Sequence, residues 1–436
     1  MKQRISRLLF SAFIVASLAG CSTVGDFFSG DEAEERLPGE RQSVLQLEEE
    51  LEPDPILESS QITIPEAWNN QYWPQYAGYP NHAMGHVALG PDVKNIWNTD
   101  IGEGGSETNP LYMPPIVADN TIFTLDTKLR VSAIDAQSGK VLWAKKLPVK
   151  KTRAESALGG GLAYHAGSVY ATTGLRQLFV ISPQNGNVTQ TIDLPAPARA
   201  APSVLDDKIY VQLLNNRLNV YSTDDYKLVW AFDGIAETTS LLGATAPAVD
   251  KDVVVAAFSS GEIVALRNAN GQTLWSDSLA SVKPASALAS IADIKGAVVL
   301  DKGLAYALSY NGRMIATDIA TGRRVWQRDL GGTQTPWAAG NVVYVITSER
   351  ELAALSRTDG RIFWVTPLGG RDWYGPVLAG DRLIAVEAQG NMVEYDPATG
   401  KVLGNRELKS APASAPVVSG NRLFVLLKNG TLAAYR

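Results

Sequence analysis

Thr321-Gly322-Arg323-Arg324-Val325-Trp326 is the clearest copy of a phrase that recurs along this chain: a turn carrying Gly, with Trp four residues later. The same spacing occurs in 139–143, 271–275 and 360–364. Three weaker copies, 186–190, 226–230 and 400–404, keep either the Gly or the Trp. From Gly139 to Gly400 there are six intervals of about 43.5 residues each, a period typical of four-stranded propeller blades.

Within one period the apolar residues alternate with a period of two. Residues 303–309 and 313–318 are two such runs, and Asn311-Gly312 separates them. Short alternating runs bounded by turn residues indicate antiparallel strands. Asn-Gly favours a type I′ hairpin turn, in which both central residues have positive φ. We expect the same hairpin at 260–261, 389–390 and 429–430.

Eight outer-strand positions can be counted, which predicts an all-β, eight-bladed β-propeller of four-stranded antiparallel blades over residues 93–436. The last unit stops before its outer strand, whereas residues 93–101 resemble an outer strand with no blade before it. We therefore expect the N-terminal strand to complete the last blade and close the ring, which hides sheet edges that would otherwise aggregate. The eight positions are Trp97, Trp143, Gln190, Trp230, Trp275, Trp326, Trp364 and Gly404.

The six tryptophans at these positions recur once per blade. A cofactor or sugar platform is the alternative interpretation, but this regular spacing favours structural anchors between neighbouring blades. We therefore predict that role for Trp97, Trp143, Trp230, Trp275, Trp326 and Trp364.

The N-terminus has the pattern of a secretory signal peptide. Lys2, Arg4 and Arg7 precede an uncharged apolar run, and Leu18-Ala19-Gly20-Cys21 ends it. This ending resembles the bacterial lipobox, which implies cleavage before Cys21 and acylation of that residue. Cys21 is the only cysteine, so no intramolecular disulfide can form. We expect residues 1–20 to be removed and several acyl chains to hold the protein stably at a membrane.

Charge is concentrated in the segment that follows. Residues 31–58 contain eleven Asp and Glu against Arg36 and Arg41, while residues 59–436 have a net charge of +1. We interpret residues 21–60 as an acidic flexible tether. The near-neutral ring gives no electrostatic reason to expect nucleic acid as a partner.

Residues 61–92 are rich in aromatic side chains, and we expect this segment to pack on the propeller. His82 and His86 stand four apart, a spacing that would suit a metal site on a helix. Pro80, Gly85 and Gly90 argue against a helix there, so we expect surface histidines and no metal site. No catalytic motif is recognisable, and we predict neither an enzyme nor a cofactor.

The stretch 316–326, Ala-x-Asp-x-x-Thr-Gly-x-x-x-Trp, is similar to the repeat of pyrroloquinoline-quinone dehydrogenases. That resemblance implies an enzyme with a quinone, calcium ligands and, in many members, a disulfide between adjacent cysteines. This chain has no cysteine beyond Cys21 and no recognisable ligand set.

A lipobox, a tether and eight such blades resemble the BamB family of lipoproteins, which belong to the outer-membrane β-barrel assembly machinery. Residues 312–314 and 335–337 lie in stretches that resemble the alphaproteobacterial branch. The resemblance implies a scaffold at the outer membrane that faces the periplasm and binds the POTRA domains of BamA. It also implies the other subunits of the BAM complex as partners, with unfolded β-barrel proteins as further candidates.

In that family the surface that binds BamA lies on neighbouring loops leading into first strands. The resemblance places Leu241 and Leu242 on one such loop, with Leu242 where the family has Arg. Asp293 on the next loop matches an acidic contact residue, while Lys295 replaces a second acid. The alternatives remain that both leucines begin a buried strand and that Asp293 is an ordinary turn acid. A quinoprotein dehydrogenase and an envelope-polymer or carbohydrate-binding propeller remain open as other functions.

Overall fold

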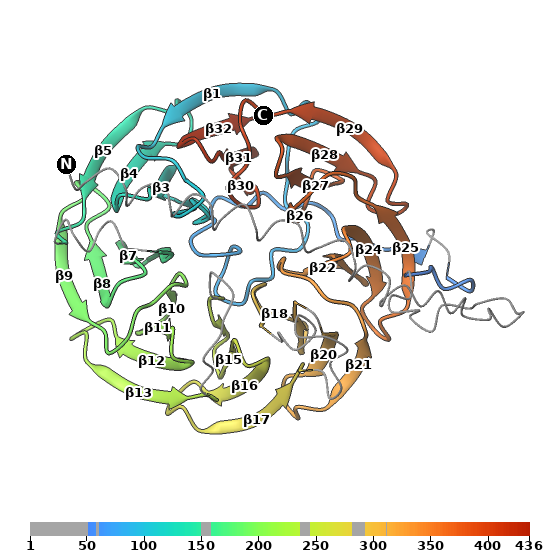
Figure 1. Cartoon of the computed structure of the whole chain (residues 1–436), viewed down its shortest axis with the longest axis horizontal. Coiled ribbons are helices and arrows are strands. Elements are labelled where there is room, and N and C mark those ends of the chain that lie inside the picture. Colours follow the sequence, from blue (N-terminus) through green and yellow to red (C-terminus); the bar gives the residue numbers. More distant parts are fainter. Residues whose placement is uncertain (1–50, 58–60, 150–157, 236–244, 281–292, 311) are drawn as a thin grey trace, which may run out of the picture. The chain divides into compact units, whose positions relative to one another are not determined.

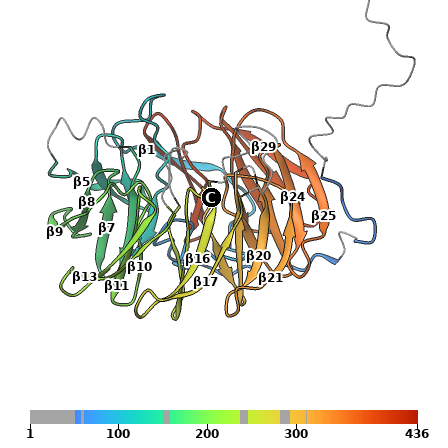
Figure 2. The same cartoon turned by 60° about the horizontal axis from the view of Figure 1, so that its bottom comes forward.

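A computed structural model describes residues 51–57, 61–149, 158–235, 245–280, 293–310 and 312–436. Within these ranges the regular structure is entirely β, and no helix is long and apolar enough to cross a membrane. The strands form eight four-stranded antiparallel sheets arranged as blades around a common centre (Figure 1 and Figure 2). The predicted eight-bladed propeller is therefore confirmed.

Each blade runs from a first strand beside the centre to an outer strand on the rim (Figure 1). Blade 1 consists of β2 (Ile116–Ala118), β3 (Thr121–Leu125), β4 (Arg130–Asp135) and β5 (Val141–Lys146), and blade 2 of β6 (Gly161–His165), β7 (Ser168–Thr172), β8 (Gln177–Ile181) and β9 (Val188–Asp193). Blade 3 consists of β10 (Ser203–Leu205), β11 (Lys208–Leu213), β12 (Arg217–Ser222) and β13 (Leu228–Asp233), and blade 4 of β14 (Ala248–Val249), β15 (Val253–Ala257), β16 (Glu262–Arg267) and β17 (Thr273–Ser278).

Blades 5 to 8 continue around the ring with the same order of strands. Blade 5 consists of β18 (Val299–Asp301), β19 (Leu304–Leu308), β20 (Met314–Asp318) and β21 (Arg324–Arg328), and blade 6 of β22 (Trp337–Ala339), β23 (Val342–Ile346), β24 (Glu351–Ser356) and β25 (Ile362–Pro367). Blade 7 consists of β26 (Trp373–Ala379), β27 (Arg382–Glu387), β28 (Asn391–Tyr395) and β29 (Val402–Glu407), and blade 8 of β30 (Val417–Ser419), β31 (Arg422–Leu426), β32 (Thr431–Tyr435) and β1 (Asn95–Asp100).

The ring closes as the sequence predicts. β1 from the N-terminal side pairs antiparallel with β32 from the C-terminus, and Trp97 lies opposite Ala434. Backbone hydrogen bonds in both directions join Lys94 and Arg436, each 2.9 Å long. The last blade is therefore built from the first and the last strands of the described chain.

The recurring Gly and Trp meet across the junctions between blades. Gly322 of blade 5 has φ of +71°, and a Cβ atom there would lie 2.5 Å from the Trp275 indole of blade 4. The indole N–H of Trp275 donates to the Ile319 carbonyl, also in blade 5, at 2.8 Å. The other five tryptophans make the same two contacts with the next blade: Trp97 with Gly139, Trp143 with Gly186, Trp230 with Gly271, Trp326 with Gly360 and Trp364 with Gly400.

A β-bulge occurs at the start of each outer strand, and in six blades the tryptophan directly follows the extra residue. In blade 5 Ala316 pairs with Trp326 and Thr317 pairs with Arg324, so Val325 is the extra residue. In five of the six Trp-bearing blades the residue opposite the Trp is alanine, whose small side chain leaves room for the indole. In several blades the extra residue is apolar and exposed: Ile96, Leu142, Val229, Leu274 and Leu403.

The predicted turn type was wrong for three of the hairpins between second and third strands. Gly261, Gly390 and Gly430 have positive φ, but the residues before them do not. Type I′ geometry instead occurs between first and second strands, as at Asp119 and Asn120 with φ of 49° and 57°. The fourth predicted hairpin includes residue 311, which lies outside the described residues.

Candidate functional site

Residues 61–92, here called the strap, run along the ends of the first strands. Figure 1 shows this segment in blue inside the ring. Its contacts reach every blade, and they follow the order of the blades around the ring. Hydrogen bonds join the strap to the blades between Thr63 and Asn341, Asn70 and Val418, Trp73 and Val117, Pro74 and Tyr164, Gln75 and Val204, Pro80 and Val249, Asn81 and Leu300, Gly85 and Trp337, and Val87 and Leu378.

Two aromatic side chains of the strap illustrate how it is held. Trp73 is buried and stacks on Trp337 with ring centroids 6.1 Å apart. The hydroxyl of Tyr72 donates to the Asp119 carboxylate at 2.6 Å, and the Tyr164 hydroxyl donates to the same carboxylate. Both hydrogen bonds favour ionised Asp119, and they hold its pKa below the usual range.

The two strap histidines correct the expectation of surface residues, because only 3% of His82 and 1% of His86 is exposed. His82 Nδ1 lies 2.7 Å from the Val298 carbonyl, and burial lowers the pKa of His82 to about 4. His86 Nδ1 lies 2.8 Å from the Pro65 carbonyl, while its Nε2 accepts the Asp381 N–H at 2.9 Å. Both imidazoles therefore secure the strap. Among the described residues no cluster of three or more His, Cys, Asp or Glu suits a metal ion.

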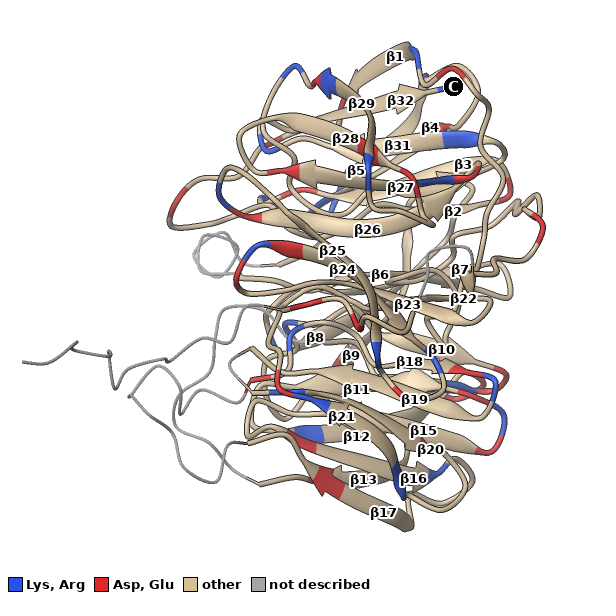
Figure 3. Cartoon of the chain, turned by 90° about the vertical axis from the view of Figure 1, so that its right-hand side faces the viewer, with Lys and Arg blue, Asp and Glu red and all other residues tan. Residues whose placement is uncertain are grey.

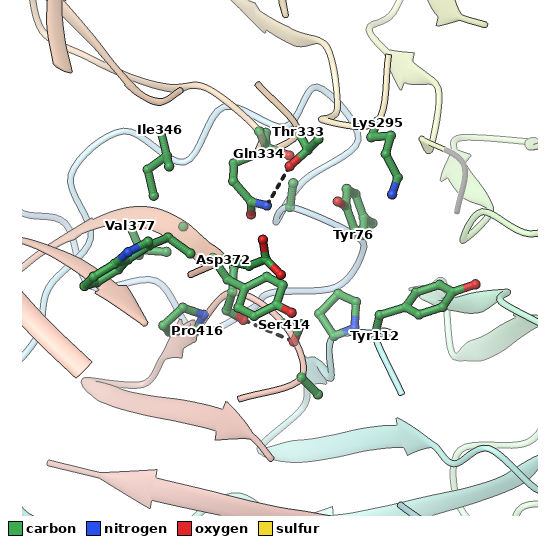
Figure 4. A pocket seen from close by; sticks show the side chains of 18 of the residues that line it. Tyr76, Tyr112, Lys295, Thr333, Gln334, Ile346, Asp372, Val377, Ser414 and Pro416 are labelled. Atoms are coloured by element: carbon green, nitrogen blue, oxygen red, sulfur yellow. Dashed lines mark hydrogen bonds between the residues drawn. The ribbon is translucent and has the colours of Figure 1, made fainter. Parts of the chain in front are cut away.

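A central cavity of about 590 Å³ lies between the strap and the loops at the opposite ends of the first strands. Tyr76, Ala77 and His82 of the strap line it, as do residues of the loops that lead into first strands or join second to third strands. In Figure 4 the side chains of Tyr76, Lys295 and Asp372 surround the same space. Its walls carry apolar and aromatic groups, including Tyr112, Ile346, Trp373, Val377 and Pro416.

The charged side chains that line the cavity are mostly basic. Asp372 is the one acid among the described lining residues, against the five basic residues Arg199, Lys295, Arg350, Arg371 and Lys428. Burial lowers the pKa of Lys295, and the neighbouring carboxylates of Asp293 and Asp372 oppose that shift. On the side of the ring that faces the viewer in Figure 3, the ribbon positions of basic and acidic residues are interspersed.

The structure describes only some of the residues singled out from the sequence. Cys21, Leu241 and Leu242 lie outside the described residues. Asp293 is buried, with 5% exposed, and its carbonyl accepts the Tyr310 N–H at 2.9 Å. It lies two residues before Lys295, at the end of the loop between β17 and β18, and therefore beside the cavity wall.

Sequence reasoning singled out Lys295 but did not predict that it shares a cavity with four other basic residues. Arg199, Lys295 and Arg371 each precede a first strand by a few residues, a shared position that could have been noticed once the blades were aligned. Their convergence depends on the ring, because each belongs to a different blade. No local pattern marks them as neighbours.

Comparisons with known proteins give a consistent result. A family model described as "Outer membrane protein assembly factor BamB" matches residues 127–366 and 367–436. The outer membrane protein assembly factor BamB of Yersinia pestis is 25% identical over 357 residues, which cover 79% of this chain and 91% of the relative.

Two solved structures show the fold alone, because their sequence identities are low. BamB from Moraxella catarrhalis has a TM-score of 0.69 at 18% identity and covers 79% of this chain and 99% of its own. A quinohemoprotein alcohol dehydrogenase from Comamonas testosteroni has a TM-score of 0.67 at 12% identity, with coverages of 86% and 82%. The propeller is thus shared by assembly factors and by enzymes, and the fold does not decide between them.

Proposed function

The chain belongs to the BamB family of outer membrane protein assembly factors, and on this premise we propose that it is a non-enzymatic scaffold lipoprotein of the BAM complex. It binds the POTRA domains of BamA and assists the assembly and insertion of β-barrel proteins into the outer membrane. The match of the family model over most of the propeller carries this proposal. The names of the curated relatives support it, since they describe assembly factors and not dehydrogenases.

The proposed attachment to the membrane rests on Cys21. Acylation there, after removal of residues 1–20, holds the protein at the outer membrane with the propeller in the periplasm. More than one acyl chain is needed for stable attachment, and the lipobox pattern supplies a site for them. The part of the tether from residue 21 to residue 50 could reach at most about 100 Å if fully extended, so the anchor by itself does not fix the orientation of the ring.

We place the surface that binds BamA on the loops before β14 and β18. Leu241 and Leu242 belong to the first loop, and Asp293 ends the second. The connection from β17 to β18 is longer than the other connections from an outer strand to the next first strand, which favours it as a binding loop. Because Asp293 is buried, its role is to support this loop beside Lys295, whereas the two leucines provide apolar contact.

Co-purification from detergent-solubilised envelopes tests the proposal. We expect the tagged wild-type chain to recover BamA, and the double variant Leu241→Glu/Leu242→Glu to lose it. Leu403→Glu is the matched control, because Leu403 is an apolar residue on β29 with 55% exposed, far in sequence from the loops. Failure of the wild type to recover BamA would reject the scaffold function. Full recovery by the double variant would move the binding surface elsewhere.

A further inference from the structure

The strap lies across one end of the central cavity. The strap crosses the ends of the first strands in all eight blades, and Tyr76, Ala77 and His82 form the floor beneath the cavity. Most of the remaining lining residues belong to loops at the other end of the first strands, and parts of β22, β23, β26 and β30 complete the wall. A volume of about 590 Å³ lies within the range of ligand-binding sites in proteins. A polypeptide cannot pass through such a cavity, but a chain end can enter it.

The charge of the cavity selects between the two ends of a chain. Five basic side chains and one acidic side chain line the described part of its wall, and low-dielectric walls strengthen the resulting positive potential. That potential attracts a carboxyl terminus and repels an amino terminus. The buried Asp293 beside Lys295 offsets part of the charge without reversing it.

The positions of the basic groups argue against a compact anion as the ligand of the cavity. Arg199, Lys295, Arg350, Arg371 and Lys428 come from loops of blades 3, 5, 6, 7 and 8, so they surround the cavity instead of converging from one loop. Between them lie apolar and aromatic side chains such as Tyr112, Trp373 and Pro416. Phosphate has no apolar surface to bury against such a wall, whereas a peptide can bury apolar side chains there.

We propose that the central cavity binds the carboxyl-terminal end of an extended peptide chain. The terminal carboxylate lies among the basic side chains, and the apolar side chains before it pack on the aromatic wall. The strap is part of this site because it supplies the floor. The proposal does not depend on where, or whether, BamA binds.

Fluorescence anisotropy with the lipidated full chain in detergent tests this site. The probe is a fluorescein-labelled hexapeptide with alternating apolar and polar residues, a leucine at its end and a free carboxylate. Its control is the same peptide with a terminal carboxamide. We expect the carboxylate peptide to bind at least about tenfold more tightly, as a charge-assisted hydrogen bond predicts.

Variants of the chain then locate the binding. Arg371→Met/Lys428→Met should weaken binding of the carboxylate peptide at least about tenfold. The control Lys140→Met/Lys302→Met removes the same charge from exposed residues outside the cavity lining and should leave the affinity unchanged. Thermal midpoints establish that both double variants are folded. If Arg371→Met/Lys428→Met is not folded, the single variant Arg350→Met takes its place.

Three results would overturn the proposal. The first is equal affinity for the carboxylate and carboxamide peptides. The second is an equal effect of the two double variants. The third is tighter binding of inorganic phosphate than of the carboxylate peptide, which would assign the cavity to a compact anion.

Discussion

At the scale of single residues, the repeated glycine is required by its backbone conformation and by its neighbour. Gly322 has φ of +71°, and a side chain there would meet the Trp275 ring. The junction of blades 2 and 3 supports this explanation. Blade 2 has Gln190 in place of Trp, and blade 3 has Tyr226 in place of Gly. Without an indole to accommodate, the turn tolerates a side chain, and Tyr226 packs on the cluster between these blades.

Substitution of Gly322 separates these two requirements. Gly303 has φ of +80°, and a Cβ atom added there would have no neighbour within 4 Å, so Gly303→Ala should cost only the backbone strain, about 1 kcal/mol. Gly322→Ala has the same strain and in addition a Cβ atom 2.5 Å from Trp275 Cγ, so it should cost at least about 1 to 3 kcal/mol more. Denaturant unfolding measures both values. Equal losses of unfolding free energy in the two variants would show that the Trp275 indole moves aside without a measurable cost.

The pairing of Gln190 with Tyr226 can be tested by a double-mutant cycle. Gln190→Trp alone should destabilise the chain, because the new indole meets the Tyr226 side chain. Combined with Tyr226→Gly, it should be more stable than the sum of the single changes by about 1 to 2 kcal/mol, the range of coupling between residues in contact. Unfolding free energies of the four chains give this coupling. Strict additivity would contradict the explanation.

At the scale of elements, six of the eight blades contact the next blade through an indole on the outer strand. Trp326 is buried, donates to the Arg357 carbonyl at 2.8 Å and packs on Gly360. We predict that Trp326→Ala lowers the free energy of unfolding by about 3 to 5 kcal/mol, through lost burial and a cavity. Leu403→Ala is the control, since this bulge residue is exposed and should change stability by less than about 0.5 kcal/mol. A wild-type thermal midpoint for Trp326→Ala would reject the anchoring role.

The blades could be predicted from the sequence because their determinants are local. Alternating runs, turn residues and the Gly-to-Trp spacing all act within one period, and closure by residues 93–101 followed from two incomplete units. The cavity could not be predicted, since its floor and walls meet only in the closed ring. Tyr76 of the floor and Lys295 of the wall, for example, line the same cavity although they lie far apart in the chain. The buried state of His82 and His86 was missed for the same reason, because their partners lie in distant blades.

At the scale of the whole molecule, the strap joins blades that are not neighbours in the chain. The pairing of β1 with β32 closes the ring, and the hydrogen bonds of the strap to all eight blades stabilise the closed ring further. His82 is part of this attachment. Its imidazole is buried beside Tyr76, with ring centroids 6.2 Å apart, and must remain neutral because burial opposes the charged form.

His82 therefore predicts a loss of stability in mild acid. Its pKa is about 4 in the folded chain against 6.5 in an exposed imidazole, so between these values the unfolded chain binds a proton that the folded chain does not. Stability contributed by neutral His82 is complete above pH 6.5 and falls by roughly 2 kcal/mol at pH 5. His82→Gln should reduce the difference in unfolding free energy between pH 7 and pH 5 by this amount, whereas His165→Gln, at a less buried site, should not. Other groups titrate equally in both variants, so an unchanged pH dependence in His82→Gln would show that the strap does not hold a neutral imidazole.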